Sequence, residues 1–211
     1  MRIAKGGWLR AGIALASGIV VLVISRLTGG ALSVILSVFA GFFMLIAGFF
    51  IYFFRDPDRE YPEGEGIVLS PADGRIMDIV QNRENTTIKI FMSPLDVHIQ
   101  RAPVSGMIES VEYMPGKFLR AYEPAASLEN EKNTIKMRDD KLEQFEVVQI
   151  AGIMARRIVC WVKENSRVSR GERIGMIKLG SQVNLKMPSR VRVQVKPGER
   201  VVAGVTVVGR E

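Results

Sequence analysis

Arg-Val-Arg-Val-Gln-Val-Lys, residues 190–196, alternates valine with charged or polar side chains. Successive side chains of a β-strand point to opposite faces, so this period of two predicts a strand with three valines on its buried face. Short apolar runs separated by Gly, Pro, Asn and Asp occur at residues 67–70, 75–80, 86–92, 106–113, 145–151 and 156–162. Many short strands with turn signals between them favour a compact barrel over a layered α/β fold. We therefore expect residues 55–211 to be a mainly β soluble domain, similar to a barrel or a barrel-sandwich hybrid.

Two further segments bear on this domain. Residues 123–140 are the most polar part, and we expect a loop over the barrel there, with one short helix. The segments Val168–Ile174 and Val195–Val201 show a weak internal sequence similarity, here called the echo. Each contains Val-x-x-Gly-Glu, which is typical of a tight turn between strands. Two independent hairpins and a true repeat both explain this echo.

Charge and cysteine content exclude several classes of protein. The 211 residues include 29 Lys and Arg against 22 Asp and Glu, a net charge of +7. Residues 1–54 hold four of the basic residues and no acid, so residues 55–211 carry only 25 − 22 = +3, which argues against a nucleic-acid partner. Cys160 is the only cysteine and His98 the only histidine, so we expect neither a disulfide-stapled fold nor a metal site.

The N-terminal 54 residues read as a membrane anchor. Residues 11–25 and 27–54 are uncharged and are separated only by Arg26. A helix of roughly 20 apolar residues spans a bilayer core, so we expect a hairpin of two transmembrane helices that turns near residues 26–30. A secretory signal peptide is the competing interpretation, but no cleavage pattern precedes the second, longer run. The positive-inside rule places both ends of the hairpin in the cytoplasm, since five basic residues flank it there: Arg2, Lys5, Arg10, Arg55 and Arg59.

Three side chains are candidates for chemistry in the β domain. His98 is the only imidazole, Asp73 lies in the turn-like sequence Ser-Pro-Ala-Asp-Gly, and Ser181 follows Gly180. A base, an orienting carboxylate and a hydroxyl nucleophile are what covalent catalysis by serine requires. Most chains of this size contain such a trio, so on its own it proves nothing.

Six short motifs in order are more specific. They are Phe53–Pro57, Ser70–Gly74, Met92–Gly106, Pro115–Phe118, Glu129–Asn133 and Leu179–Ser181. From about Phe53 to Pro188 the sequence closely resembles the short-form phosphatidylserine decarboxylase proenzymes, relatives of the archaetidylserine decarboxylase type included.

The resemblance implies a proenzyme that cuts itself between Gly180 and Ser181. The products are a β chain of residues 1–180 and an α chain of residues 181–211, which remain associated, and Ser181 becomes a covalent pyruvoyl group. In this scheme His98 is the base and acid, and Asp73 orients it. The pyruvoyl ketone takes up the substrate amine and accepts the electrons left by departing CO2.

The resemblance also implies a substrate and a location. The substrate is an aminophospholipid, phosphatidylserine or archaetidylserine, in the cell membrane. The positive-inside rule, applied above, places the catalytic domain on the cytoplasmic side. The sequence leaves open which lipid tails are used and whether the chain forms a homo-oligomer. Basic residues that are candidates for contact with the phosphodiester are Arg55, Arg59, Arg101, Lys117 and Lys132, although for any one of them an ordinary solvated surface charge is the favoured interpretation.

One departure and one alternative accompany this hypothesis. Longer members of the family carry a second histidine three residues after the first, where this chain has Arg101, so the division of labour at His98 stays open. The alternative is a membrane-anchored β adaptor or carrier domain without enzymatic activity. A biotinyl or lipoyl carrier needs a lysine at a hairpin tip within its consensus, and Lys186-Met187 does not supply one.

Overall fold

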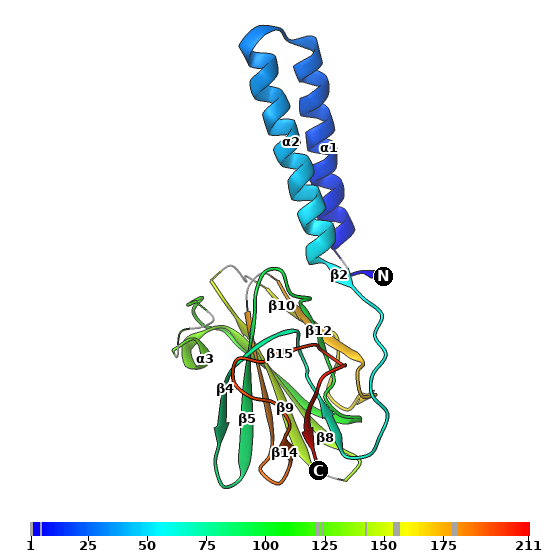
Figure 1. The fold of residues 1–211 in the computed structure, drawn as a ribbon, viewed down its shortest axis with the longest axis vertical. Coiled ribbons are helices and arrows are strands. Elements are labelled where there is room, and N and C mark those ends of the chain that lie inside the picture. Colours follow the sequence, from blue (N-terminus) through cyan, green and yellow to red (C-terminus); the bar gives the residue numbers. More distant parts are fainter. Residues whose placement is uncertain are drawn as a thin grey trace. The chain divides into compact units, whose positions relative to one another are not determined.

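A computed structural model describes residues 2–4, 6–120, 123, 125–141, 143–153, 157–178 and 181–211. The chain divides into two compact units, Met1–Asp58 and Arg59–Glu211 (Figure 1). Each unit has its own internal packing and is described by itself.

The first unit is built on two apolar helices, α1 (Gly7–Leu27) and α2 (Gly30–Phe53). Both are long and apolar enough to cross a membrane, and they lie side by side as a hairpin (Figure 1). The turn lies between Leu27 and Gly30, as the sequence predicts, and Gly30 adopts a positive φ of 61° there. A short pair of strands, β1 (Arg2–Ile3) and β2 (Arg55–Asp56), joins the two ends of this unit.

The second unit is mainly β, which confirms the predicted fold class. Its largest sheet curls into a half-barrel and is antiparallel throughout. The strand order is β11 (Arg167–Val168), β7 (Gly106–Met114), β8 (Lys132–Asp139), β9 (Gln144–Ala151), β13 (Ser181–Pro188), β5 (Asn85–Met92), β4 (Gly74–Gln81) and β15 (Arg200–Val201).

Two small sheets of three strands complete the unit. One has the order β10 (Ile158–Cys160), β12 (Arg173–Ile177), β6 (Ile99–Arg101), and the other β14 (Arg192–Val193), β16 (Val207–Arg210), β3 (Ile67–Leu69). Alternate side chains of the long strands point into a common core, to which β5 contributes Ile88, Ile90 and Met92. A single helical turn, α3 (Ala126–Glu129), precedes β8.

Two expectations about elements need correction. The alternating run 190–196 forms a strand only at Arg192–Val193, because the Val191 N–H donates to the Pro188 carbonyl in a turn. Its valines still face the core, as predicted. The segment 123–140 contains the expected short helix, but its second half is strand β8 rather than loop. Asn133, Ile135 and Met137 alternate there as buried residues.

The β unit is a repeat with an approximate two-fold axis. Read from one edge, the large sheet runs β11-β7-β8-β9, and read from the other it runs β15-β4-β5-β13. The two small sheets match in the same way. Val168 pairs with Gly106 as Val201 pairs with Gly74, and both long hairpins have a bulge after an isoleucine, Ile108 or Ile76. The axis therefore passes between β9 and β13.

The repeat has a different register from the echo seen in the sequence. The segment that matches 195–201 is 162–168, since the Gly198 N–H donates to the Ile76 carbonyl as the Asn165 N–H donates to the Ile108 carbonyl, each over 2.8 Å. Both residues have a positive φ, 89° at Gly198 and 62° at Asn165. The true repeat replaces the glycine by asparagine, which tolerates this conformation, and this replacement hides it from motif matching.

Candidate functional site

Ser181 is the first residue of β13, the strand beside the two-fold axis. It pairs with Met92 of β5 on one side and with Ala151 of β9 on the other, and it is fully buried. Its hydroxyl donates to the Met92 sulfur over 3.4 Å. Gly180 and Leu179, which precede it, lie outside the described residues. A thioether is a weak acceptor, so the serine oxygen is held in place without being bound to a strong partner.

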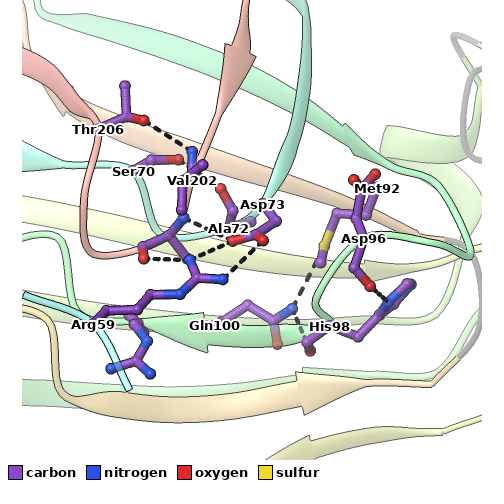
Figure 2. A network of polar contacts seen from close by, with 12 residues as sticks. Arg59, Ser70, Ala72, Asp73, Met92, Asp96, His98, Gln100, Val202 and Thr206 are labelled. Atoms are coloured by element: carbon purple, nitrogen blue, oxygen red, sulfur yellow. Dashed lines mark hydrogen bonds and ion pairs between the residues drawn. The ribbon is translucent and has the colours of Figure 1, made fainter. Parts of the chain in front are cut away.

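His98 is also fully buried and lies immediately before β6. Its Nδ1 is 2.8 Å from the Asp96 carbonyl oxygen (Figure 2). A carbonyl can only accept, so Nδ1 carries the hydrogen and, in the neutral ring, the lone pair lies on Nε2. This arrangement leaves Nε2 as the atom that can take up or deliver a proton.

Asp73 occupies the turn before β4 and binds Arg59 with both carboxylate oxygens. The distances are 2.6 Å from Nη1 to Oδ1 and 2.8 Å from Nη2 to Oδ2 (Figure 2). The Ala203 N–H donates to Oδ1 over 2.8 Å, and Arg59 Nη1 donates to the Ala203 carbonyl over 2.6 Å. The Nδ1 of His98 is therefore oriented by a main-chain carbonyl and not by Asp73, which instead ties Arg59 to the C-terminal segment.

The two-fold repeat separates two roles of Asp73. Its counterpart in the other half is Ser105, whose Oγ accepts the Arg170 N–H over 2.9 Å just as Asp73 accepts the Ala203 N–H. A hydroxyl is sufficient for this turn. The carboxylate of Asp73 is needed for the ion pair with Arg59.

Three buried side-chain amides form a hydrogen-bonded series that reaches His98 and Met92. Asn133 Nδ2 donates to Gln149 Oε1 (2.9 Å), and Gln149 Nε2 donates to Gln100 Oε1 (2.8 Å). Gln100 Nε2 donates to the His98 carbonyl (3.0 Å) and lies 3.6 Å from the Met92 sulfur (Figure 2). The same sulfur accepts the hydrogen bond of the Ser181 hydroxyl. His98 and Ser181 are thus linked through Gln100 and Met92.

The basic residues proposed for phosphodiester contact have partners within the protein. Besides Arg59, Arg101 is buried and donates from Nη1 to the Gly171 carbonyl over 2.9 Å. Arg55 lies over the Tyr52 ring. Lys117 pairs with Glu129 over 2.7 Å, and this hydrogen-bonded carboxylate raises the pKa of Lys117 above its ordinary value. On the outer face of the sheet, Lys136 and Ser110 lower the pKa of Glu112 in the same manner.

Motif reasoning identified Ser181, His98 and Asp73 as site residues. Met92, Gln100 and Asn133 lie within the quoted motifs but were not assigned to the site, and Gln149 lies outside all of them. A signal was present in the sequence: Gln149 interrupts the apolar run 145–151, and a polar residue inside a buried strand needs a partner. Among the described residues, no group of three or more His, Cys, Asp or Glu is arranged to hold a metal ion.

Comparison with known proteins shows the family to which this sequence is related. The family model for phosphatidylserine decarboxylase matches residues 46–209. A phosphatidylserine decarboxylase proenzyme of Chlorobium chlorochromatii is 43% identical over 178 residues, which cover 81% of this chain and 82% of the relative. Proenzymes of the same name from Symbiobacterium thermophilum and Streptomyces avermitilis are 39% and 41% identical, over 99% and 100% of this chain and 95% and 94% of the relatives. This chain therefore belongs to the phosphatidylserine decarboxylase family of carboxy-lyases.

Proposed function

We propose that this protein is a membrane-anchored decarboxylase that converts phosphatidylserine into phosphatidylethanolamine and CO2 after cutting itself between Gly180 and Ser181. Archaetidylserine carries the same headgroup and fits the same chemistry. The observation that carries the proposal is the environment of Ser181, a buried serine at the start of a central strand that is linked through Met92 and Gln100 to the main chain of the only histidine. Membership of the family favours this enzyme over an anchored adaptor.

Self-cleavage needs only groups of the chain and one water molecule. Ser181 Oγ attacks the Gly180 carbonyl, the amide C–N bond breaks, and the nitrogen gains the proton lost by the hydroxyl, so an ester and a free amine replace the peptide bond. Loss of the Ser181 Cα proton then expels the Gly180 carboxylate, and water replaces the nitrogen, which leaves as ammonia. The α chain then begins with a pyruvoyl group at position 181.

His98 is the proposed proton carrier in this reaction. Its ring is fixed through Nδ1 by the Asp96 carbonyl, so Nε2 is the basic atom in the neutral state. The serine hydroxyl is a weak nucleophile at neutral pH and needs such a base. In decarboxylation the same atom would deliver the proton that replaces CO2.

The described residues around position 181 fit a pyruvoyl group. Ser181, Met92 and His98 are all fully buried. The group would be held covalently at the start of β13, between β5 and β9. Its ketone supplies a carbonyl that takes up the substrate amine and withdraws electrons as the carboxylate leaves. Burial there limits access of water to the reacting atoms.

The helical hairpin suits a substrate that lies in a bilayer. The two apolar helices suggest membrane association, and the basic residues at both ends of the hairpin favour a cytoplasmic catalytic domain. An anchored enzyme meets the serine headgroup at the membrane surface and does not need to extract the lipid.

Intact mass of the purified, denatured protein tests the proposal first. We expect two chains divided after Gly180, the shorter one lighter by one ammonia than a peptide that begins with serine. Ser181→Ala should give one uncut chain without activity towards phosphatidylserine in detergent micelles. One full-length chain of unmodified mass in folded wild-type protein would overturn the proposal.

A second variant tests the assignment of His98. The side-chain amide of asparagine can donate to the Asp96 carbonyl as Nδ1 does, but it has no counterpart of Nε2. His98→Asn should therefore fold and lose cleavage or turnover. Wild-type rates of both would remove His98 from the mechanism.

A further inference from the structure

The amides of Asn133, Gln149 and Gln100 form a buried chain that spans both layers of the β unit. Asn133 and Gln149 face each other on β8 and β9 of the large sheet, and Gln100 lies on β6 of a small sheet. All three are fully or almost fully buried. Polar side chains removed from water in this way cost free energy unless they are hydrogen-bonded to one another. Their presence needs a reason.

The two-fold repeat provides an internal comparison for these positions. Gln100 pairs with Gly175 as Val68 pairs with Gly209, and Asn133 pairs with Gln149 as Thr86 pairs with Met187. The surroundings of the two glycines support this matching, because each glycine faces the equivalent side chain. A Cβ at Gly175 would lie 2.7 Å from Gln149 Nε2, and a Cβ at Gly209 would lie 3.4 Å from the Met187 sulfur.

The half of the repeat that contains β3, β5 and β13 therefore has no amide side chains at the equivalent positions. Val68, Met187 and Thr86 are buried at the three equivalent positions, and within the described part of the chain Thr86 Oγ1 makes no hydrogen bond. Packing of apolar groups is thus sufficient for this architecture. The amide chain occurs only in the half that reaches His98, so the fold does not explain it.

Gln149, the neighbour of Gln100 in this series of hydrogen-bonded amides, determines how the Gln100 amide is oriented. Gln149 donates to Gln100 Oε1, which leaves the Gln100 nitrogen to face the His98 carbonyl and the Met92 sulfur (Figure 2). A flipped amide would place oxygen against the His98 carbonyl oxygen, which is repulsive. The Met92 sulfur so held is also the acceptor of the Ser181 hydroxyl.

We propose that Gln100, oriented by Gln149 and Asn133, is a positioning residue for the first step of self-cleavage, fixing the His98 main chain and, through Met92, the Ser181 hydroxyl. This inference rests on the proposed function. Among the described residues, Gln100 is hydrogen-bonded to Gln149 and His98 and lies against the Met92 sulfur, so it reaches the Ser181 hydroxyl only through Met92. Its effect is on the geometry from which Ser181 Oγ attacks.

Two substitutions remove the hydrogen bonds that orient or are made by Gln100 while preserving side-chain volume. Gln100→Met loses both hydrogen-bond donors, and Gln149→Met places at position 149 the residue that the other half uses at position 187. The matched control is Met187→Leu, a core change of similar size in the half that has no amides. Precursor made by cell-free synthesis into detergent micelles is followed by the appearance of the two chains, with and without hydroxylamine.

Hydroxylamine identifies the step that is slowed. It attacks an ester at Gly180, forms the hydroxamate and releases Ser181 with its hydroxyl and amine intact, so it accelerates chain separation only where the ester has formed. We expect Gln100→Met to cleave about tenfold more slowly or worse, since loss of about one well-placed hydrogen bond raises a barrier by that factor. Hydroxylamine should not restore its rate, and the control should cleave like the wild type.

The outcomes separate this inference from the proposed function. If the wild type cleaves and both amide variants cleave at its rate, or if hydroxylamine restores them, the positioning role is refuted and the proposed function stands. If the wild type does not cleave, the proposed function itself fails. Should Gln100→Met fail to fold, Gln149→Met decides the question, because it leaves Gln100 in place and should still slow cleavage more than Met187→Leu does.

Discussion

Arg59 and Asp73 form a nearly buried ion pair in the β unit, with side chains 7% and 14% exposed. Both oxygens of the carboxylate are used, and the pair also holds the main chain of Ala203 on both its N–H and its carbonyl. Arg59 lies directly after the first unit, and Ala203 lies in the segment 181–211 that the proposed cleavage would make the α chain. One guanidinium thus connects the start of the β unit with its C-terminal segment.

Asp73→Asn should destabilise the protein strongly, because it leaves Arg59 charged and without its counter-ion. Breaking one side of a buried pair costs about 3 kcal/mol, which for a chain of this size lowers the melting temperature by about 5–10 °C. The measurement is thermal unfolding by circular dichroism in detergent, on the uncut Ser181→Ala background. The double variant Arg59→Gln/Asp73→Asn should regain part of the loss.

Asp78→Asn is the control for this experiment. Its carboxylate pairs with Lys89 over 3.1 Å on the surface, where an ion pair contributes about 1 kcal/mol or less. Equal decreases in melting temperature for Asp73→Asn and Asp78→Asn would show that the Arg59–Asp73 pair stabilises the protein no more than a surface ion pair does.

At the scale of elements, the helical hairpin packs through small residues and serines. Ala11, Ala14, Gly18, Ala40 and Ala47 are buried between or along the helices. The Ser25 hydroxyl is 2.8 Å from that of Ser37 and donates to the Ser33 carbonyl over 2.8 Å. Lipid tails are as apolar as leucine, so close backbone approach and hydrogen bonds, rather than the hydrophobic effect, hold such helices together.

Gly18→Leu should separate the two helices. A Cβ at this position would lie 3.2 Å from the Phe43 Cβ and 3.3 Å from the Ala40 carbonyl oxygen, whereas a Cβ at Gly12 has nothing within 4 Å. Overpacking costs about 1–3 kcal/mol, so oxidative cross-linking of a Ser25→Cys/Ser37→Cys pair, in a Cys160→Ser background, should slow by about tenfold. Gly12→Leu is the control, and equal cross-linking rates in the two variants would contradict the packing described.

At the scale of the whole molecule, the strands of the segment after residue 180 pair mainly with strands from the rest of the β unit. Strand β13 lies between β5 and β9, β15 pairs with β4, and β16 pairs with β3. Only the contact between β14 and β16 joins two strands of this segment. Cleavage before Ser181 would thus leave the hydrogen bonds and the shared core intact.

The two chains should consequently stay together after cleavage. We expect a single particle on gel filtration in mild detergent, and separation into chains of 180 and 211 − 180 = 31 residues only in a denaturant. Mass spectrometry of the gel-filtration peak checks this. Loss of the short chain under native conditions would mean that the strand pairings do not hold it.

The sequence alone determined the features that depend on local order in the chain. Hydrophobic runs set the two helices and their turn, alternation and glycine spacing set most strands, and the motifs pointed to Asp73, His98 and Ser181 and to the family. Strand β8 was missed because its polar neighbours mask the alternation. The roles of those three residues remain predictions.

Only the tertiary structure decided which residues meet. Asp73 binds Arg59, the His98 ring is oriented by a carbonyl, and Gln100 joins His98 to the sulfur beside Ser181. The two-fold repeat likewise emerges from strand pairing, since its halves share a hydrogen-bond pattern more than they share residues. The physical reason is that periodicity specifies the face of an element, while partners far apart in sequence are selected by how the sheets close around one core.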